Sequence, residues 1–457
     1  MSVVGNDALG NPVVALNQMS AVQAAAAISK GEITSEELVS ACLRAIEAID
    51  PKVEAWTFLD PEYALSQACE ADRQRRSGMP LGPLHGVPVG VKDIFDTQDM
   101  PTEDGTPLHA GRTPAQDATA VSRLREAGAV IMGKTVTTEL AVYAPGKTHN
   151  PHDPRRTPGG SSSGSAAAVA AAMVPLAIGT QTNGSVIRPA SYCGVVGYKP
   201  SHGLISRYRV LALSRQLDHV GVFARSVEDA ALVAQQMMGF DERDPDTRPM
   251  PKHDLLSVAA QEPPTPPRLA FLKTSVWDQA DADLVAGFAE LNGFLGERVE
   301  EIELPEVFSN AHDWHRCIME TDLAENLHRE YERGGEAMSQ VLRNMIQHGR
   351  GTLAIDYNKA SRMIPALNAI LTETLLEYDA ILTPATTGEA PIGLESTGSP
   401  AFCTLWSLCG VPTLTLPLLQ GSNGMPAGVQ MVAAKGDDAR LLRTARWLAE
   451  FTADTPV

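Results

Sequence analysis

The sequence predicts an α/β fold in which a β-sheet core is covered by α-helices on both faces. Three observations support this prediction. Short apolar stretches of strand length recur along the chain, segments of helical periodicity separate them, and an alanine-rich block at residues 166–173 leads into further apolar residues. Alternation of strands and helices is typical of a sheet with both faces covered.

The first helix with a clear start signal is expected at Thr34. Thr34 and Glu37 fit a capping box, in which the side chains of the N-cap and of the third helical residue bond to each other's backbone N–H groups. Leu38, Cys42 and Ile46 then recur at helical spacing and form one apolar face.

Strands and helices continue to alternate after this helix. The segment 84–95 predicts a short buried strand, which ends at Lys92 and Asp93. Residues 118–127 predict a helix and residues 129–132 the next strand. The small side chains of the alanine-rich block allow its helix to approach the sheet closely.

The composition changes near residue 241, where the chain becomes rich in proline and charge, as it does again at 261–267. Further elements are expected as a strand at 268–273, a helix-biased region at 281–378, strands at 380–384, 412–417 and 428–432, and a last helix from about Asp437. We therefore expect a single domain over residues 1–457 with a helix-rich, substrate-side excursion at residues 280–378.

The composition also disfavours several classes of function. The net charge of −18 argues against a nucleic-acid partner, because phosphate binding requires a basic surface. The six cysteines lack paired metal-binding spacing and are typical of buried thiols in a reducing compartment. The N-terminus lacks the basic and apolar regions of a signal peptide, and no apolar run approaches membrane-spanning length. We expect a cytoplasmic protein that does not bind membranes.

Two serine-containing turns flank the alanine-rich block and carry the most chemistry. They read Gly-Gly-Ser-Ser at 159–162 and Thr-Gln-Thr-Asn-Gly-Ser at 180–185. Glycine before a serine permits turns that expose a hydroxyl and direct N–H groups to one point. Asparagine and glycine tolerate positive φ, so the N–H groups of Thr182, Asn183 and Gly184 are expected to converge on an oxyanion. The alternative is that Asn-Gly forms only a hairpin turn.

This pattern resembles the amidase signature family. In that family a lysine at the end of a strand, a serine in Gly-Gly-Ser-Ser and a second serine form a Ser–Ser–Lys triad. Lys92, Ser161 and Ser185 occupy these positions, and Ser185 follows Ser161 by 24 positions. The resemblance implies a mixed sheet between helices, a cis peptide bond between Gly160 and Ser161, and no cofactor.

The resemblance extends from about residue 20 to residue 450, and three positions depart from it. The matching segments around the triad are 82–88, 150–151, 193–200, 217–218 and 224–229. Gln181 stands where the family usually has aspartate, and Asn183 adds a side chain that narrows the acyl pocket or donates a hydrogen bond. Arg188 lies one place later than the arginine of many members.

The resemblance also assigns roles to these residues. Ser185 is the nucleophile, Ser161 passes the proton, and Lys92 is the base. Ser162 is a structural hydrogen-bonding partner. The remaining supporting residues are Gln181, Arg188 and Asp218.

A lysine acts as a base only when it is neutral. The pKa of Lys92 must therefore fall by about three units from its ordinary value of about 10.4, which burial can supply. The apolar residues on both sides of Lys92 in the sequence favour such burial. Asp93 would oppose the shift if it faced Lys92, so we expect its side chain to point elsewhere and bond to the backbone. Ser163 and Ser165 are expected to cap the following helix or bond locally.

A histidine base is the main chemical alternative to Lys92. The histidines near the motifs in sequence are His85, His109, His149, His152, His202 and His219. Each lies in polar, loop-like sequence without an adjacent nucleophile turn. The sequence contains no His-x-x-x-His or Cys-x-x-Cys pair, so no catalytic metal is expected.

These observations predict an amidase that hydrolyses a small-molecule amide, aryl amide or carbamate (urethane) through an acyl-enzyme on Ser185, as a monomer or homodimer. One alternative is the glutaminase subunit of a tRNA-dependent amidotransferase. In such subunits the nucleophile is followed by Ile-Arg-Gln-Pro-Ala, whereas Arg188 here directly precedes Pro189. Another alternative is a non-catalytic scaffold, which would be expected to have lost a triad residue.

Substrate specificity is expected to lie in the variable segments 100–150, 280–378 and 385–410. Four large apolar residues of these regions are candidates for a pocket or for core packing: Trp314, Met319, Phe402 and Trp406.

Overall fold

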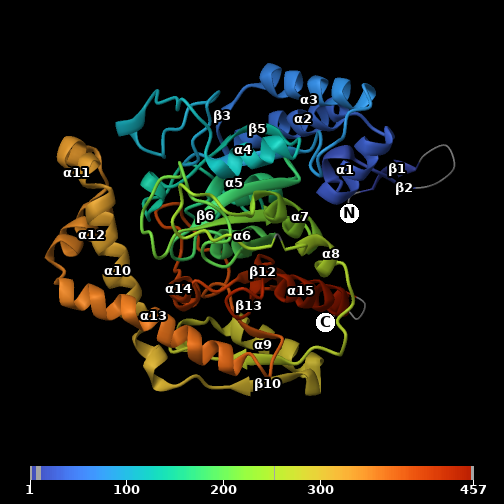
Figure 1. The fold of residues 1–457 in the computed structure, drawn as a ribbon. Helices are drawn as coiled ribbons and strands as arrows, with labels where there is room; N and C mark the ends of the chain where they lie inside the picture. The colour runs from blue at the N-terminus through green and yellow to red at the C-terminus, as the bar shows by residue number, and fades with distance from the viewer. Residues whose placement is uncertain (1–2, 7–11, 252, 454–457) are drawn as a thin grey trace.

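A computed structural model describes residues 3–6, 12–251 and 253–453 of the chain. The described residues form two sheets. A small one pairs β1 (Val3–Asn6) with β2 (Pro12–Val14), and the large one has 11 strands in the order β10-β9-β11-β13-β12-β7-β8-β6-β4-β5-β3. The large sheet runs through the molecule from β3 near the top of Figure 1 to β10 at the bottom.

The strands of the large sheet are β3 (Trp56–Leu59), β4 (Pro88–Lys92), β5 (Val130–Thr135), β6 (Leu176–Gln181), β7 (Val196–Lys199), β8 (His219–Ala224), β9 (Leu269–Leu272), β10 (Val299–Ile302), β11 (Ala380–Pro384), β12 (Thr413–Gln420) and β13 (Pro426–Val432). The sheet is mixed, as the family resemblance implied. β4 runs parallel to β5 and β6, whereas β6, β8, β7 and β12 pair antiparallel in turn.

The α-helices are α1 (Ala21–Lys30), α2 (Ser35–Val53), α3 (Pro61–Arg76), α4 (Thr119–Glu126), α5 (Ser163–Ala170), α6 (Ile187–Cys193), α7 (Val227–Met237), α8 (Leu255–Ala259), α9 (Ala282–Leu295), α10 (Ala311–Asn326), α11 (His328–Gly334), α12 (Gln340–Gly351), α13 (Ala354–Thr374), α14 (Ala401–Cys409) and α15 (Asp438–Ala453). The expected capping box at Thr34 and Glu37 is present at the start of α2.

Helices cover both faces of the sheet, which confirms the predicted fold class. Leu176 and Ile178 of β6 belong to one hydrophobic core, which also contains residues of α4, α7 and α15. Ala177, between them, points to the opposite face and packs in a second core with residues of α2, α5 and α6. This alternation follows from the two-residue period of a strand, and it leaves β6 buried on both sides.

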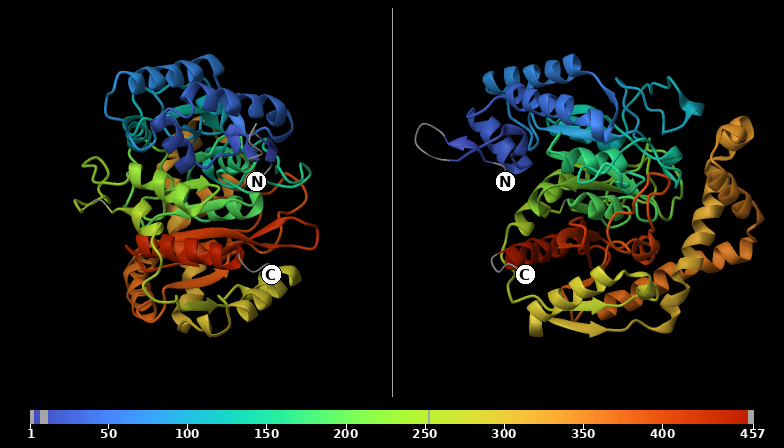
Figure 2. Two further views of the ribbon diagram at one scale, coloured as in Figure 1. Left: turned by 90° about the vertical axis from the view of Figure 1, so that its right-hand side faces the viewer. Right: turned by 180° about the vertical axis from the view of Figure 1, so that it is seen from behind.

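The helix-biased region at 281–378 is only partly helical, so this prediction was wrong in one respect. Residues Val299–Ile302 form β10, which pairs in parallel with β9 at the edge of the large sheet. Glu300 and Glu301 of β10 are exposed and Val299 and Ile302 are half-buried, so the strand lacks the apolar run of a central strand. The helical excursion itself comprises α10 to α13, which stand apart from the sheet on one side of the molecule (Figure 2).

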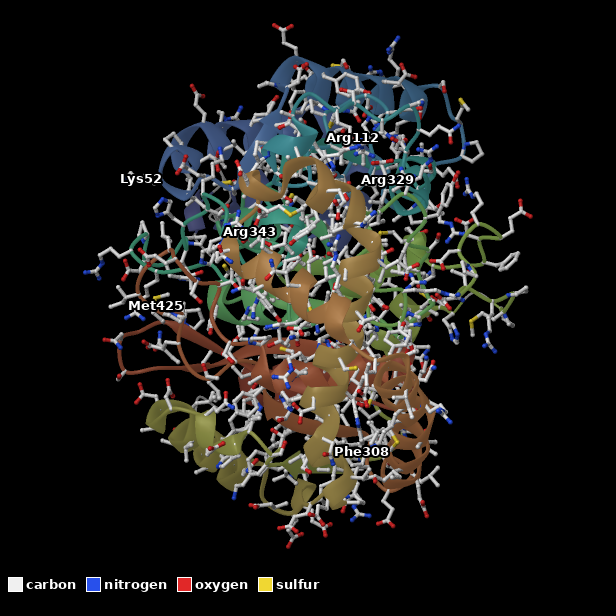
Figure 3. The ribbon with its side chains drawn as sticks, turned by 90° about the vertical axis from the view of Figure 1, so that its left-hand side faces the viewer. Lys52, Arg112, Phe308, Arg329, Arg343 and Met425 are labelled. Carbon is white, nitrogen blue, oxygen red and sulfur yellow. The ribbon has the colours of Figure 1, made fainter. Side chains whose placement is uncertain are left out.

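The tip of the excursion returns to the N-terminal half of the chain. His109 Nε2 lies 3.3 Å from the Glu330 carboxylate of α11, and the backbone N–H of Ser339 donates to Glu139 at 2.9 Å. Figure 3 looks at this face, where the excursion helices cross in front of the central part of the molecule and Arg329 appears near Arg112. The excursion thus bridges the two ends of the sheet.

Close packing of α5 against the sheet gives a stability prediction. A Cβ added to Gly164 would overlap the backbone oxygen of Ala55 and the backbone nitrogen of Val136. We expect Gly164→Ala to lower the free energy of unfolding by about 1–3 kcal/mol because the backbone must move. Urea unfolding followed by circular dichroism measures the change.

Gly293→Ala is the matched control, because Gly293 is exposed on α9 and nothing lies within 4 Å of its added Cβ. It should be neutral or stabilise the protein by up to about 1 kcal/mol, since alanine is the better helix former. Equal effects of the two substitutions would contradict the packing argument.

Candidate active site

Lys92 lies at the end of β4, between β5 and β6, and is fully buried. Its Nζ donates hydrogen bonds to Ser161 Oγ and to Thr180 Oγ1, both at 2.8 Å. The first of these contacts joins two of the residues that the sequence pattern proposed as a triad, although they are 69 positions apart in the chain. Both partners are neutral hydroxyls.

Burial lowers the pKa of Lys92 well below its ordinary value of 10.5. The cause is desolvation, which disfavours the charged ammonium, and the nearby Asp218 carboxylate opposes the shift. The direction of the shift is the one that a lysine base requires.

In the described part of the chain the Asp93 carboxylate has no hydrogen bond or ion pair with the Lys92 ammonium, as expected. Its carboxylate accepts a hydrogen bond from the backbone N–H of Glu103 at 3.1 Å and lies 3.0 Å from the Nζ of Lys134, a second fully buried lysine. Burial raises the pKa of Asp93 to about 6, while Lys134 acts in the opposite direction. The acidic neighbour is therefore paired with a different lysine.

Ser161 precedes α5, and its surroundings fix the backbone on both sides. The Gly160–Ser161 peptide bond is cis, as the resemblance implied. The buried guanidinium of Arg188 donates to the carbonyl oxygen of Gly160 at 2.7 Å, and the carbonyl of Ser161 accepts from the N–H of Thr138 at 3.2 Å. Arg188, which lies in α6 just after Ser185, thus holds the backbone next to Ser161.

The other serines of the first turn bond to the backbone. Ser162 Oγ both donates to the carbonyl and accepts from the N–H of Thr180 at 3.3 Å, which makes it a structural partner as expected. Ser163 Oγ donates to the carbonyl of Gly159, and Ser165 Oγ donates to the carbonyl of Ile178. The bonds of Ser162 and Ser165 attach the start of α5 to β6.

Ser185 lies in the turn between β6 and α6 and is 8% exposed. Neither Asn183 nor Gly184 is among the described residues with positive φ, so this turn does not use the left-handed conformation that both residue types tolerate. Gly184 instead allows a close approach to α14. A Cβ there would lie 3.0 Å from Pro400 Cβ and 3.4 Å from Cys403 Cβ, at the start of α14.

Gln181, the first departure from the family pattern, holds this turn against α6. Its Oε1 accepts hydrogen bonds from the N–H groups of Val186 and Ile187, at 2.8 and 3.0 Å. Its Nε2 donates to Ser407 Oγ of α14 at 3.0 Å, and that hydroxyl donates to the carbonyl oxygen of Asn183. The amide therefore satisfies helix N–H groups that have no partner within the helix.

Asn183, the second departure, connects three segments. Its Nδ2 donates to the hydroxyl of Tyr143 at 2.9 Å, and its Oδ1 accepts from Thr404 Oγ1 of α14 at 2.8 Å. The side chain thus donates a hydrogen bond, one of the two roles expected from the sequence, and the donation goes to the protein itself.

Thr182 is fixed through its side chain and its carbonyl group. Its hydroxyl donates to Asp218 Oδ1 at 2.6 Å, and its carbonyl oxygen lies 3.0 Å from Nε2 of the buried His315 on α10. Asp218 Oδ2 accepts from the N–H groups of Leu213 and Ser214. The carboxylate therefore connects the second serine turn to the loop before β8.

The six histidines considered as alternative bases bond elsewhere. Among the hydrogen bonds of the described residues, none joins one of these rings to the hydroxyl of Ser161 or Ser185. Their partners are Ala71 for His85, Asp104 and Glu330 for His109, Pro154 for His149, Cys193 for His152, Arg215 and Arg207 for His202, and Leu217 and Gln181 for His219. The described part of the chain also contains no cluster of three or more metal-binding side chains.

The sequence reasoning missed several neighbours of the site. Thr180 directly precedes Gln181 in the motif and has a hydroxyl, but its contact with Lys92 depends on the pairing of β4 with β6. Tyr143 and His315 come from distant segments without any sequence signal. Of the four apolar pocket candidates, Met319, Phe402 and Trp406 are buried and Trp314 packs partly buried against the core.

Comparison with known proteins identifies the family of this chain. The family model for Amidase matches residues 37–442. A curated relative from Chloroflexus aggregans, one of the subunits of its glutamyl-tRNA(Gln) amidotransferase, is 33% identical over 94% of this chain and 95% of its own length. The chain belongs to the amidase signature family.

The fold is also similar to those of solved structures over nearly the whole chain. The native peptide amidase of Stenotrophomonas maltophilia superposes with a TM-score of 0.82, at 29% identity, over 95% of this chain and 97% of that chain. A protein from a vestigial complex described as revealing the origins of an s-triazine catabolic enzyme gives a TM-score of 0.88, at 28% identity, over 96% and 99%. In the described part of the chain, no helix has the length and apolarity needed to cross a membrane.

The pKa of Lys92 leads to a pH prediction. Lys92 accepts a proton only when neutral, so kcat/KM should fall as pH decreases through its pKa and level off above it. The midpoint should lie well below 10.5. Lys92→Arg should abolish turnover, because a guanidinium stays protonated. Rate measurements from acidic to alkaline pH test both expectations.

His149→Ala and His152→Ala are the controls, because both side chains bond to backbone carbonyl groups away from Lys92. They should keep most of the activity and the same pH profile. If a histidine variant with an intact fold were as inactive as Lys92→Arg, the result would contradict the lysine mechanism and favour a histidine base.

Proposed function

We propose that this chain hydrolyses the carbon–nitrogen bond of a small-molecule amide through an acyl-enzyme on Ser185, with Ser161 and Lys92 as the proton relay. The observation that carries the proposal is the 2.8 Å hydrogen bond between Lys92 Nζ and Ser161 Oγ, in a setting that lowers the pKa of the lysine. Membership of the amidase signature family supports it.

The proposed reaction begins with attack of Ser185 Oγ on the amide carbon. The proton of Ser185 passes to Ser161, whose own proton passes to neutral Lys92. The N–H groups around Thr182, Asn183 and Gly184 stabilise the oxyanion. Collapse of the intermediate breaks the C–N bond, and the proton returns through Ser161 to the leaving nitrogen. Water then repeats the attack on the ester and releases the acid and Ser185.

A second candidate function is the glutaminase subunit of a tRNA-dependent amidotransferase. Curated relatives at 33% identity over nearly the whole chain are subunits of glutamyl-tRNA(Gln) amidotransferases, and they favour this candidate. The peptide amidase among the solved structures supports direct hydrolysis of amides. Both functions use the same acyl-enzyme chemistry and differ in the substrate and in the need for partner subunits.

The nucleophile is tested by covalent labelling. Ser185→Ala should retain the fold and reduce hydrolysis to near background, because no acyl-enzyme forms. A fluorophosphonate or sulfonyl fluoride should label Ser185 in the unmodified protein, as mapped by peptide mass spectrometry. Ser165→Ala is a matched control, since Ser165 Oγ bonds to the backbone of β6. Label mainly on Ser161 or a cysteine would overturn the assignment.

The two candidate functions are separated by substrate. The isolated chain should hydrolyse simple amides, aryl amides or carbamates without a partner protein if it is an amidase. Release of ammonia from glutamine, but not from simple amides, would support the amidotransferase function. An assay of the purified chain with both substrate classes decides between them.

A further inference from the structure

The backbone N–H groups of the second serine turn are free of hydrogen bonds within the described part of the chain. Those of Thr182, Asn183, Gly184 and Ser185, which lie between β6 and α6, donate to no described acceptor. All four residues are buried. Buried N–H groups are almost always paired, so four consecutive free ones are available to a ligand. In the reaction proposed above, that ligand is the oxyanion.

The direction of each of these N–H groups is set by the carbonyl group that precedes it. In a trans peptide, the C=O of one residue and the N–H of the next lie in one plane and point in opposite directions. Among the described residues the only cis peptide bond is Gly160–Ser161, so the peptides of the second turn are trans. A hydrogen bond that holds a carbonyl of this turn therefore also aims the next N–H group.

His315 holds the carbonyl of Thr182, which shares its peptide plane with the N–H of Asn183. Nε2 of His315 lies 3.0 Å from this oxygen, and the side chain is buried on α10, the first helix of the excursion. Because a carbonyl oxygen can only accept, Nε2 carries the proton and donates it. Burial lowers the pKa of His315 to about 4, so the ring is neutral near neutral pH.

The next two peptide planes are held from other directions. Ser407 of α14 donates to the carbonyl of Asn183, whose plane contains the N–H of Gly184. The carbonyl of Gly184 accepts from the N–H of Arg188 in the first turn of α6 at 2.9 Å, and its plane contains the N–H of the proposed nucleophile. Of these three bonds, the one from His315 comes from the excursion.

Other contacts of α10 fix the helix on both sides of His315. One turn earlier, Nε2 of His312 lies 3.0 Å from the carbonyl of Ala401 at the start of α14. Further along the helix, the carboxylate of Asp322 accepts from the hydroxyls of Ser214 and Tyr357. The imidazole donor is therefore carried by an anchored helix, which gives it a defined position.

We propose that His315 is a positioning residue of the oxyanion site, because its hydrogen bond to the carbonyl of Thr182 aims the N–H of Asn183 at the oxygen that becomes negative. A donor that is oriented before the reaction stabilises the developing charge without having to reorganise. The proposal rests on the acyl-enzyme mechanism proposed above. It applies to both candidate functions, because both use that mechanism.

Removal of the imidazole donor tests this role. His315→Phe keeps a ring and loses the donor, so kcat for p-nitroacetanilide should fall about tenfold to a hundredfold with KM unchanged. This loss is smaller than the roughly 10²–10³-fold effect of deleting an oxyanion donor outright. His315→Gln restores an N–H donor and should recover most of kcat, whereas His315→Leu should not. If the chain is an amidotransferase subunit, glutamine replaces the anilide in the same assay.

Binding of an oxyanion mimic gives a second measurement. Ser185 Oγ adds to the carbonyl carbon of an aryl trifluoromethyl ketone, the carbonyl electron pair moves to oxygen, and the serine proton passes through Ser161 to Lys92. The Ki should rise in His315→Phe by the factor by which kcat/KM falls, because both depend on the same N–H groups. An unchanged Ki would overturn the proposal. A rise in KM alone would also overturn it, because His315 would then act in substrate binding.

His312→Phe is the matched control, because it removes a similar imidazole-to-carbonyl bond from the same helix. It should retain most of the activity and the same Ki. Equal losses in the two variants, each expressed per site labelled by a fluorophosphonate, would assign the effect to the packing of α10 and overturn the proposal. Absence of label on Ser185 in the unmodified protein would instead refute the proposed function. Normal labelling, with kcat unchanged in His315→Phe, would refute only the role of His315.

Discussion

The chemistry of this site depends on the burial of Lys92 without an ionic partner. Complete burial can lower the pKa of a lysine by up to about 3–5 units, but a carboxylate in contact would cancel much of that shift. Two features prevent the contact. Lys134 pairs with Asp93, the adjacent carboxylate, and the hydroxyls of Ser161 and Thr180 accept the hydrogen bonds of Lys92. The position of β4 inside the sheet, between β5 and β6, supplies the burial.

The second serine turn depends on neutral hydrogen bonds in the same way. Gln181 accepts from two N–H groups at the start of α6 and donates to Ser407, whereas a carboxylate at this position could only accept. Ser407 then holds the carbonyl of Asn183. Gln181 and Asn183, two of the three departures from the family sequence, are thus bonded to α14, and they make the position of the turn depend on the packing of that helix.

The sequence predicted those parts of the site that depend on local patterns. Lys92 at the end of a strand and two serine turns around a small-residue helix are such patterns, and the 24-residue spacing linked the two turns to a family. The contacts of Thr180, Tyr143 and His315 could not be predicted, because they depend on strand order and on distant helices. The strand β10 was missed because an edge strand with exposed glutamates has no clear apolar pattern.

The helical excursion shows why substrate preference is harder to predict than the catalytic residues. His315 contacts the carbonyl of Thr182, and Asn326 donates to the carbonyl of Leu213 at 3.0 Å. One helix, α10, therefore braces both the second serine turn and the loop between β7 and β8. The position of that loop depends on how α10 packs against residues more than 100 positions earlier in the chain. Changes in the excursion can thus move these two segments without altering Lys92, Ser161 or Ser185.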